Sequence, residues 1–149
     1  MTDETQTQNT RYAVVVAKWN SFVTDGLLKG AIDTLEAKGF EAQVFEVPGA
    51  FELPLVCQEA AKSPAFAAVI ALGAVIRGDT PHFDYVCTGV TQGITQASLT
   101  TGRPIAFGVL TTDNVEHAIA RSRDDANNKG AEAALAAIEM VDVLESIPT

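Results

Sequence analysis

Four short apolar runs, rich in β-branched residues, alternate along the chain with longer segments of helical periodicity. The runs occupy residues 12–18, 40–47, 67–75 and 104–110. The third, AAVIALGAV, is almost continuously apolar, which is typical of a strand covered on both faces. Repeated βα units of this kind predict an α/β protein with right-handed crossovers, a three-layer αβα sandwich around a four-stranded parallel sheet.

The segments between the runs have the periodicity and the boundary residues of helices. In the first segment apolar residues recur at every fourth position, at Val23, Leu27, Ala31 and Leu35. Pro54 is tolerated only in a first helical turn, so the second helix should begin near Glu52. The predicted helices span residues 21–38, 52–62, 81–99, 114–123 and 130–145. In the last of them the expected buried stripe is Leu135, Ile138 and Val141.

Composition and charge exclude two classes of partner. Hydrophobic residues make up 47% of the chain, yet no apolar run approaches the ~18 residues of a membrane helix. The net charge of −9 argues against nucleic acid, because binding to a phosphate backbone needs a basic face. We therefore expect neither a membrane nor a nucleic-acid partner, although one or two local cations could still bind a small anion.

The cysteines and the first residues indicate the compartment. Cys57 and Cys87 form no CxxC pair, and each is interpreted as a packed structural thiol. Residues 1–10 are polar and acidic, without the basic region or the apolar stretch of a secretory signal. We expect residues 1–10 to be a disordered tail, residues 11–149 to be a single domain, and the protein to be cytoplasmic.

The end of the third predicted strand carries the most informative residues. In a parallel sheet, ligands bind beyond the carboxyl ends of the strands. Thr80 can be the N-cap of the following helix, with Pro81 at the N1 position and His82 at N2. The free N–H groups of that turn form a natural anion site, and the helix dipole disfavours a charged imidazole, so His82 could accept a proton. A surface histidine beside a helix cap is an equally good interpretation of the local pattern.

For three other residues near strand ends, a functional interpretation and a purely structural one are both open. Trp19 could stack on a flat heterocycle or close the rim of the core. Glu52 could accept hydrogen bonds from hydroxyls, although a helix start favours glutamate in any case. Arg121, on the helix after the fourth strand, could simply be solvated. The sequence contains no GxxxxGK[ST], no GxGxxG and no histidine–cysteine cluster with metal-ligand spacing, so no nucleotide cofactor or metal is expected.

Five segments place these residues in a known context: KWN from Lys18, VPGAFELP from Val47, GAVIRGDTPHFDYV from Gly73, FGVLTTDN from Phe107, and NKG from Asn128. In this order and spacing they resemble the lumazine synthase family over residues 11–143. The resemblance implies a flavodoxin-like fold and a cofactor-free transferase of riboflavin biosynthesis. Such an enzyme condenses 5-amino-6-ribitylaminouracil with 3,4-dihydroxy-2-butanone 4-phosphate, giving 6,7-dimethyl-8-ribityllumazine, phosphate and water in the penultimate step of the pathway.

The resemblance also implies roles for individual residues. Trp19 matches the aromatic residue that stacks on the pyrimidine ring, and His82 is similar to the general acid/base histidine. Arg121 matches the phosphate-binding arginine. The remaining contacts with the pyrimidine substrate are expected from the ribityl-binding turn and the ring pocket, at Ala50, Phe51, Glu52, Val75 and Ile76. Backbone N–H groups at Asp79 and Thr80 are expected to receive the phosphate.

By the same resemblance, Phe107 and Lys129 match residues that a neighbouring subunit adds to each site. We therefore expect a homo-oligomer, a pentamer or a multiple of one, with riboflavin synthase as a further candidate partner. A row of small residues on one face of the third helix, Gly89, Gly93 and Ala97, permits close helix packing, by resemblance at a fivefold axis or simply on the sheet.

Two alternatives share the fold class. A flavodoxin-like flavin-binding module would need a hydroxyl-rich loop after the first strand, where this chain has Trp19-Asn20-Ser21-Phe22-Val23. A phosphoacceptor signalling domain would need an acidic pair and an aspartate at the strand ends, which the chain lacks. A shell-forming structural protein is a third interpretation, and an active enzyme could also be one.

Overall fold

The computed structural model describes residues 9–149, and most of the predicted disordered tail, residues 1–8, lies outside them. Within the described residues four strands alternate with helices. The strands are β1 (Arg11–Ala17), β2 (Glu41–Val47), β3 (Val69–Ile76) and β4 (Ile105–Thr112). The helices are α1 (Ser21–Ala37), the 3-10 turn η2 (Ala50–Glu52), α2 (Leu53–Lys62), α3 (His82–Thr101), α4 (Val115–Ala120) and α5 (Lys129–Glu145). The four strands and the five predicted helices are therefore confirmed.

The strands form one parallel sheet in the order β2-β1-β3-β4. Arg11 lies opposite Glu41, and Val69 lies opposite Ile105. From β1 the chain runs outward to β2 and then crosses back over β1 to β3, so the direction of winding reverses between β1 and β3. A crevice at the carboxyl ends of these two strands is where such sheets bind ligands.

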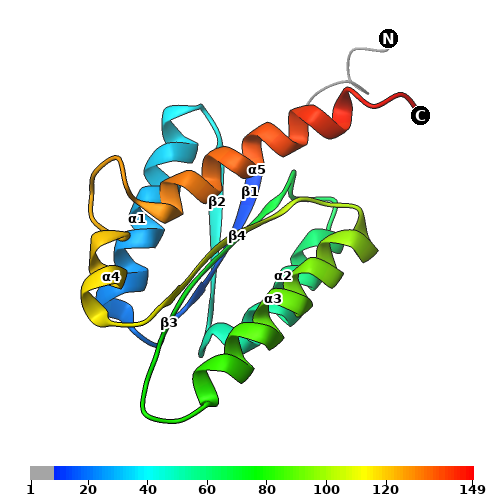
Figure 1. Ribbon diagram of the computed structural model, residues 1–149. Coiled ribbons are helices and arrows are strands. Elements are labelled where there is room, and N and C mark those ends of the chain that lie inside the picture. Colours follow the sequence, from blue (N-terminus) through cyan, green and yellow to red (C-terminus); the bar gives the residue numbers. More distant parts are fainter. Residues whose placement is uncertain (1–8) are drawn as a thin grey trace.

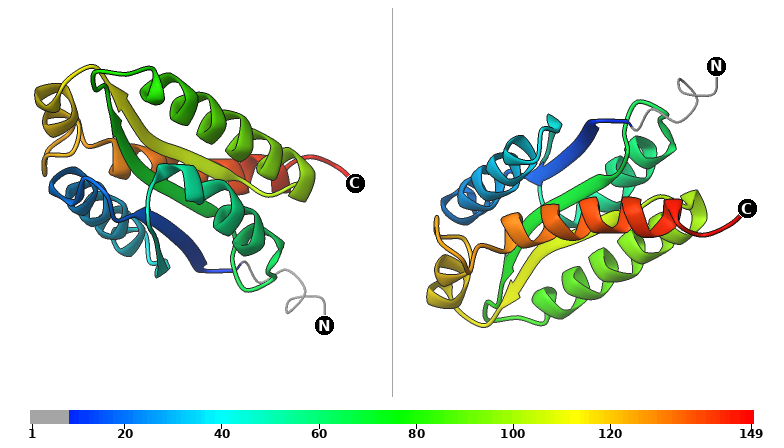
Figure 2. Two further views of the ribbon diagram at one scale, coloured as in Figure 1. Left: turned by 90° about the horizontal axis from the view of Figure 1, so that it is seen from below. Right: turned by 90° about the horizontal axis from the view of Figure 1, so that it is seen from above.

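Helices cover both faces of the sheet, with α2 and α3 on one side and α1 and α5 on the other (Figure 1 and Figure 2). Successive residues of a strand point to opposite faces. Val15 accordingly packs among α2 and α3, while Val14 and Val16 pack among α1 and α5. All three are fully or almost fully buried, which explains why β1 is apolar throughout. The predicted three-layer αβα sandwich is confirmed.

The stripe predicted for α5 is wrong in part. Leu135 is 47% exposed and Ile138 is only half-buried, whereas Val141 is buried as expected. The buried face consists mainly of small residues, namely Gly130, Ala133, Ala134, Ala137 and Val141. Close packing of α5 on α1 and on the sheet favours side chains without bulk, and sequence periodicity weighted toward large apolar residues selects a different face.

The row of small residues on α3 lies against η2 and α2 of the same chain. A Cβ atom at Gly89 would lie 2.5 Å from Cε1 of Phe51, and one at Gly93 would lie 2.7 Å from Cβ and Cγ of Pro54. Ala97 is buried in the same core. The row is therefore explained by packing within the chain, against a helix rather than the sheet.

Most helix boundaries differ from the prediction by one or two residues, and the end of α4 differs by three. Helix α3 begins at His82, with Pro81 as its N-cap, and α4 ends at Ala120. None of the helices within residues 9–149 combines the length and the hydropathy that crossing a membrane requires.

Candidate active site

A cavity of about 500 Å³ opens at the carboxyl ends of β1 and β3, where the winding of the sheet reverses. Its lining comes from the turn after β1, from η2 after β2, from the end of β3 and from the start of α3. Seven of the predicted site residues line it together: Trp19, Ala50, Phe51, Glu52, Val75, Ile76 and His82. We call this space the ring cavity, after the flat apolar and aromatic surfaces that it offers.

The turn between β1 and α1 presents Trp19 at the edge of the ring cavity. The indole is 66% exposed and lies against Gly49, where a Cβ atom would be 2.7 Å from Cζ3 of the ring. Asn20 follows in the left-handed conformation, with φ of 66°, and its Nδ2 donates a hydrogen bond of 2.8 Å to the carbonyl of Ala74. Asn20 is the N-cap residue of α1, but its side chain ties the turn to β3 instead of capping the helix.

Glu52 serves the turn after β2. The N–H of Gly49 donates to Oε1 of Glu52 over 2.9 Å, which closes the turn into η2. This contact supports the structural interpretation of Glu52, in which a helix start favours a glutamate. Glu52 lines the ring cavity as well, and because a carboxylate accepts several hydrogen bonds, the same group can hold the turn and meet a hydroxyl.

His82 is the first residue of α3, and its side chain is exposed at the mouth of the ring cavity. Its backbone N–H lies 3.4 Å from Oγ1 of Thr80, so Thr80 acts on the helix start although Pro81 is the cap residue. Asp79 and Thr80 lie in the exposed loop before α3 and do not line the cavity.

Arg77 holds this loop at both ends. Its Nε lies 2.9 Å from Oδ1 of Asp113 at the end of β4, and its Nη1 lies 3.6 Å from Oδ1 of Asp84 in α3. The guanidinium carbon is 4.4 Å from the centre of the Phe83 ring. The hydrogen bond to Asp113 and the neighbouring carboxylates raise the pKa of Arg77 further above its usual value. Its charge is therefore already engaged by the protein.

Four further residues, which the sequence did not predict as part of the site, line the ring cavity: Asn20, Ala74, Tyr85 and Val86. Tyr85 follows His82 by three positions, which places both on one face of α3. That spacing was a usable signal. The contribution of Ala74 to the site could not be predicted from the sequence, because it depends on the hydrogen bond that its carbonyl accepts from the side chain of Asn20.

The ring cavity lacks a cation. Among its lining residues the ionisable side chains are Glu52, His82 and Tyr85, with no lysine or arginine. The nearest guanidinium along the chain, that of Arg77, is paired with two aspartates. An aromatic substrate fits this surface, whereas a phosphate would find no free positive side chain in it.

Cationic side chains line a second cavity of about 290 Å³ instead. It lies between β4, the C-terminal end of α4 and the first turns of α5. Three further predicted residues line it, Phe107, Arg121 and Lys129, and it shares no lining residue with the ring cavity. We call it the cation cavity. The structure thus groups the predicted residues into an aromatic set with the histidine and a cationic set with Phe107.

The cations of this second cavity are held by backbone contacts. Arg121 is the C-cap residue of α4, and its Nη1 donates to the carbonyl of His117 over 3.0 Å. No carboxylate of the described residues lies within ion-pair distance of Arg121. Lys129 pairs with Glu132 at 3.0 Å, and its backbone N–H donates to the carbonyl of Arg121 over 2.8 Å. The two cationic residues are therefore linked directly.

The remaining candidates behave as structural or solvated groups. Cys57 is fully buried, and burial raises its pKa to about 12. Cys87 is half-buried, and its pKa is raised mainly by burial. His117 is exposed on α4. In residues 9–149 no cluster of three or more histidine, cysteine, aspartate or glutamate side chains is placed to hold a metal ion.

Comparisons with known proteins identify the family. Residues 9–145 match the family model of 6,7-dimethyl-8-ribityllumazine synthase. A protein of that name from Syntrophus aciditrophicus (strain SB) is 56% identical over 140 residues, which cover 92% of this chain and 91% of the relative.

Two solved structures give weaker likenesses. Two crystal structures of a GDP-L-fucose synthetase from Naegleria fowleri, one with NADP bound, align with TM-scores of 0.41 and 0.39 at 15% and 12% identity. The alignments cover 93% of this chain but only 44% and 43% of those chains. The family match over residues 9–145 and the 56% identical relative show that the chain belongs to the 6,7-dimethyl-8-ribityllumazine synthase family.

Proposed function

We propose that the reaction of this family takes place in the ring cavity of one chain, closed by the cation cavity of a neighbouring copy. The enzyme condenses 5-amino-6-ribitylaminouracil with 3,4-dihydroxy-2-butanone 4-phosphate, and releases 6,7-dimethyl-8-ribityllumazine, phosphate and water. One substrate is a flat heterocycle with a polyol chain and the other is a small phosphate ester. The two cavities offer the complementary surfaces separately.

The pyrimidine substrate occupies the ring cavity. Its ring stacks on the exposed indole of Trp19 and lies against the apolar side chains of Val75 and Ile76. The ribityl hydroxyls reach the turn at Ala50 and Phe51, where the carboxylate of Glu52 accepts hydrogen bonds.

The phosphate of the second substrate lies at the N-terminus of α3. Backbone N–H groups of the loop at Asp79 and Thr80 receive it, and the helix dipole favours its negative charge. Arg121 of the neighbouring copy adds a guanidinium that no described carboxylate occupies. Lys129 and Phe107 arrive with it from the same cavity.

His82 transfers protons between the two substrates. The amine of the pyrimidine attacks the ketone and one water leaves as the imine forms. Phosphate is then eliminated, the resulting enol becomes a carbonyl, and the second amine closes the ring on it with loss of a second water. His82 stands at the mouth of the ring cavity and at the helix start that receives the phosphate, so one imidazole is within reach of both partners. His82→Ala should slow turnover by roughly tenfold to hundredfold, the lower range for general acid–base catalysis, and should leave substrate binding intact.

The proposal rests on the division of the aromatic and the cationic side chains between two cavities. The aromatic set and the histidine line one cavity, the cations line another, and neither can bind both substrates. Large apolar side chains outside both cavities, among them Leu55, Leu99 and Phe22, are exposed in the single chain and suit contacts between copies. We propose a homopentamer or a multiple of one, as the family resemblance implies.

Subunit mixing tests the shared site. Trp19→Ala impairs the ring cavity and Arg121→Ala impairs the cation cavity, so each variant alone is weakly active. After dissociation and reassembly in equal amounts, random mixing around a ring restores a complete pair of cavities at about one quarter of the sites. Lumazine formation, followed by its absorbance and fluorescence, should recover accordingly.

The matched control mixes Trp19→Ala with His82→Ala. Both residues line the ring cavity, so no arrangement of chains can unite two wild-type side chains in one site. Recovery with Arg121→Ala but not with His82→Ala is the expected pattern. Equal behaviour of the two mixtures, or a fully active monomer in light scattering, would overturn the shared site.

Location and further partners are part of the proposal. Both cysteines are free thiols, which suits a reducing compartment such as the cytoplasm. Riboflavin synthase, the enzyme that takes up the product, stays a predicted partner, tested by co-purification of the two proteins. The flavin-binding alternative finds no added support, because the turn after β1 carries an indole and no row of hydroxyls.

A further inference from the structure

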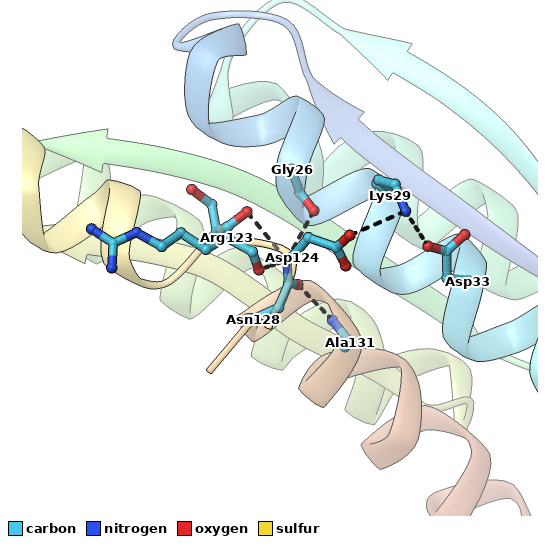
Figure 3. Close-up of polar contacts among 8 residues, drawn as sticks. Gly26, Lys29, Asp33, Arg123, Asp124, Asn128 and Ala131 are labelled. Carbon is cyan, nitrogen blue, oxygen red and sulfur yellow. Dashed lines mark hydrogen bonds and ion pairs between the residues drawn. The ribbon is translucent and has the colours of Figure 1, made fainter. Parts of the chain in front are cut away.

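The loop between α4 and α5 is exposed over residues 123–127, yet it ends in a buried side chain (Figure 3). Asn128 is 4% exposed. Its Nδ2 lies 3.0 Å from the carbonyl oxygen of Gly26 in α1, 3.2 Å from that of Ser122 and 2.8 Å from that of Arg123. One amide therefore joins the first helix to two points of a loop that lies about a hundred residues later in the chain.

The two ends of the Asn128 amide have different tasks. Its Oδ1 accepts a hydrogen bond of 3.0 Å from the N–H of Ala131 and so caps α5. An aspartate would cap equally well. Towards the three carbonyls, however, only the amide nitrogen of this side chain can donate, and an aspartate has no donor there. The nitrogen contacts are thus separable from the cap.

These contacts lie next to the cations of the cation cavity. Asn128 holds the carbonyl of Ser122, the residue after Arg121, and it directly precedes Lys129. The N–H of Lys129 in turn donates to the carbonyl of Arg121 over 2.8 Å. Fixing the amide of Asn128 therefore fixes the backbone from which both cationic side chains extend.

Helix α1 leaves space for this amide. A Cβ atom at Gly30 would overlap Oδ1 and Cγ of Asn128, and one at Gly26 would overlap the carbonyl of Ser122. The two glycines are four positions apart and so lie on one face of α1. Glycine costs helix stability at interior positions, and here it admits the loop to the helix surface.

We infer that Asn128 is a positioning residue for phosphate binding, which holds Arg121 and Lys129 in place without touching the substrate. The inference rests on the proposed role of these cations. A guanidinium that must bind a phosphate loses affinity when its backbone moves, because charge-assisted hydrogen bonds depend on geometry. The ring cavity, built from other elements, does not depend on this amide.

The test compares Asn128→Asp with the wild type in assembled protein. We expect KM for the butanone phosphate and Kd for inorganic phosphate to rise about tenfold or more, as for a weakened charged hydrogen bond. KM for the pyrimidine should stay unchanged. In the background of Arg121→Ala, the substitution should add little further loss, since both act on one interaction.

Two further variants separate positioning from charge and from general destabilisation. Asn114→Asp adds the same charge at another capping asparagine, whose Oδ1 accepts from the N–H of His117, and should leave phosphate binding unchanged. Gly30→Ala adds no charge but pushes on Asn128 from α1, and should weaken phosphate binding as Asn128→Asp does. Circular dichroism and light scattering confirm that each variant is folded and assembled.

The outcomes distinguish the inference from the proposal beneath it. If Arg121→Ala leaves phosphate affinity unchanged, the proposed role of the cations is wrong. If Arg121→Ala weakens binding while Asn128→Asp and Gly30→Ala do not, or do so no more than Asn114→Asp, Asn128 is only a helix cap.

Discussion

Two glycines one turn apart on α3 should respond in opposite ways to the same substitution. A methyl group at Gly89 would lie 2.5 Å from Cε1 of Phe51, and one at Gly93 would lie 2.7 Å from Cβ and Cγ of Pro54. Phe51 is 60% exposed, so its ring can turn away. Pro54 is a rigid ring in the first turn of α2 and cannot move without the helix.

The magnitudes follow from these two neighbours. Replacing an interior helical glycine by alanine contributes about 0.5–1 kcal/mol of helix propensity. At Gly89 the displaced ring is mobile, so the free energy of unfolding should change by less than about 1 kcal/mol. At Gly93 overpacking costs about 1–3 kcal/mol, which leaves a net loss of roughly 1–2 kcal/mol.

Function should change in the reverse order. Phe51 lines the ring cavity, so a ring displaced by Gly89→Ala should raise KM for the pyrimidine substrate, whereas Gly93→Ala should not. Urea midpoints measured at one protein concentration give stability, because assembly contributes to it, and steady-state kinetics give KM. In a Phe51→Ala background the effect of Gly89→Ala on KM should disappear. Equal destabilisation by both substitutions with unchanged KM would refute this account.

Three further outcomes are expected. Arg77→Lys should lower kcat with little change in stability, because lysine keeps the charge but loses the planar fork that spans the loop before His82; kcat equal to that of the wild type would contradict this role. Cys57 keeps its proton to about pH 12 when folded but ionises from pH 9 when unfolded, so the free energy of unfolding should fall by about 1.4 kcal/mol per pH unit in that range; Cys57→Ala should flatten the fall, and an unaltered slope in urea titrations would count against it. Asn20→Ala should be less stable than Asn20→Gly by roughly 1–2 kcal/mol, because both lose the bond to Ala74 and only alanine resists the positive φ; equal urea midpoints would show that the turn relaxes.

The strands were predictable because each is a run of β-branched residues between clear breaks. Val69–Ile76 is apolar at every position except Gly73, and no helical period competes with it. The buried face of α5 was not predictable in the same way. Alanine carries little weight in a hydrophobic pattern, yet Ala133, Ala134 and Ala137 are buried because α1 and the sheet approach closely.

The individual residues of the candidate site could be predicted from the sequence, but their division between two cavities could not. Trp19 and His82 follow different strands, and the parallel sheet brings their ends together. Arg121 was expected as the phosphate ligand, yet only the three-dimensional arrangement groups it with Phe107 and Lys129. The part of Asn128 depends on a contact with Gly26, and no local pattern in the sequence reports a pair so far apart.

The position of α5 sets an order of events while the chain is being made. All four strands and α1 to α4 precede α5 along the chain. Until α5 leaves the ribosome, apolar side chains that it covers, such as Leu72 and Leu110, face the solvent. Asn128 can cap α5 only once the N–H of Ala131 is present, and the loop packs on α1 together with that cap. The two cations are therefore placed last, and a ribosome paused before residue 129 carries a nascent chain with an uncovered apolar face and no organised cation cavity, a state suited to capture by a chaperone.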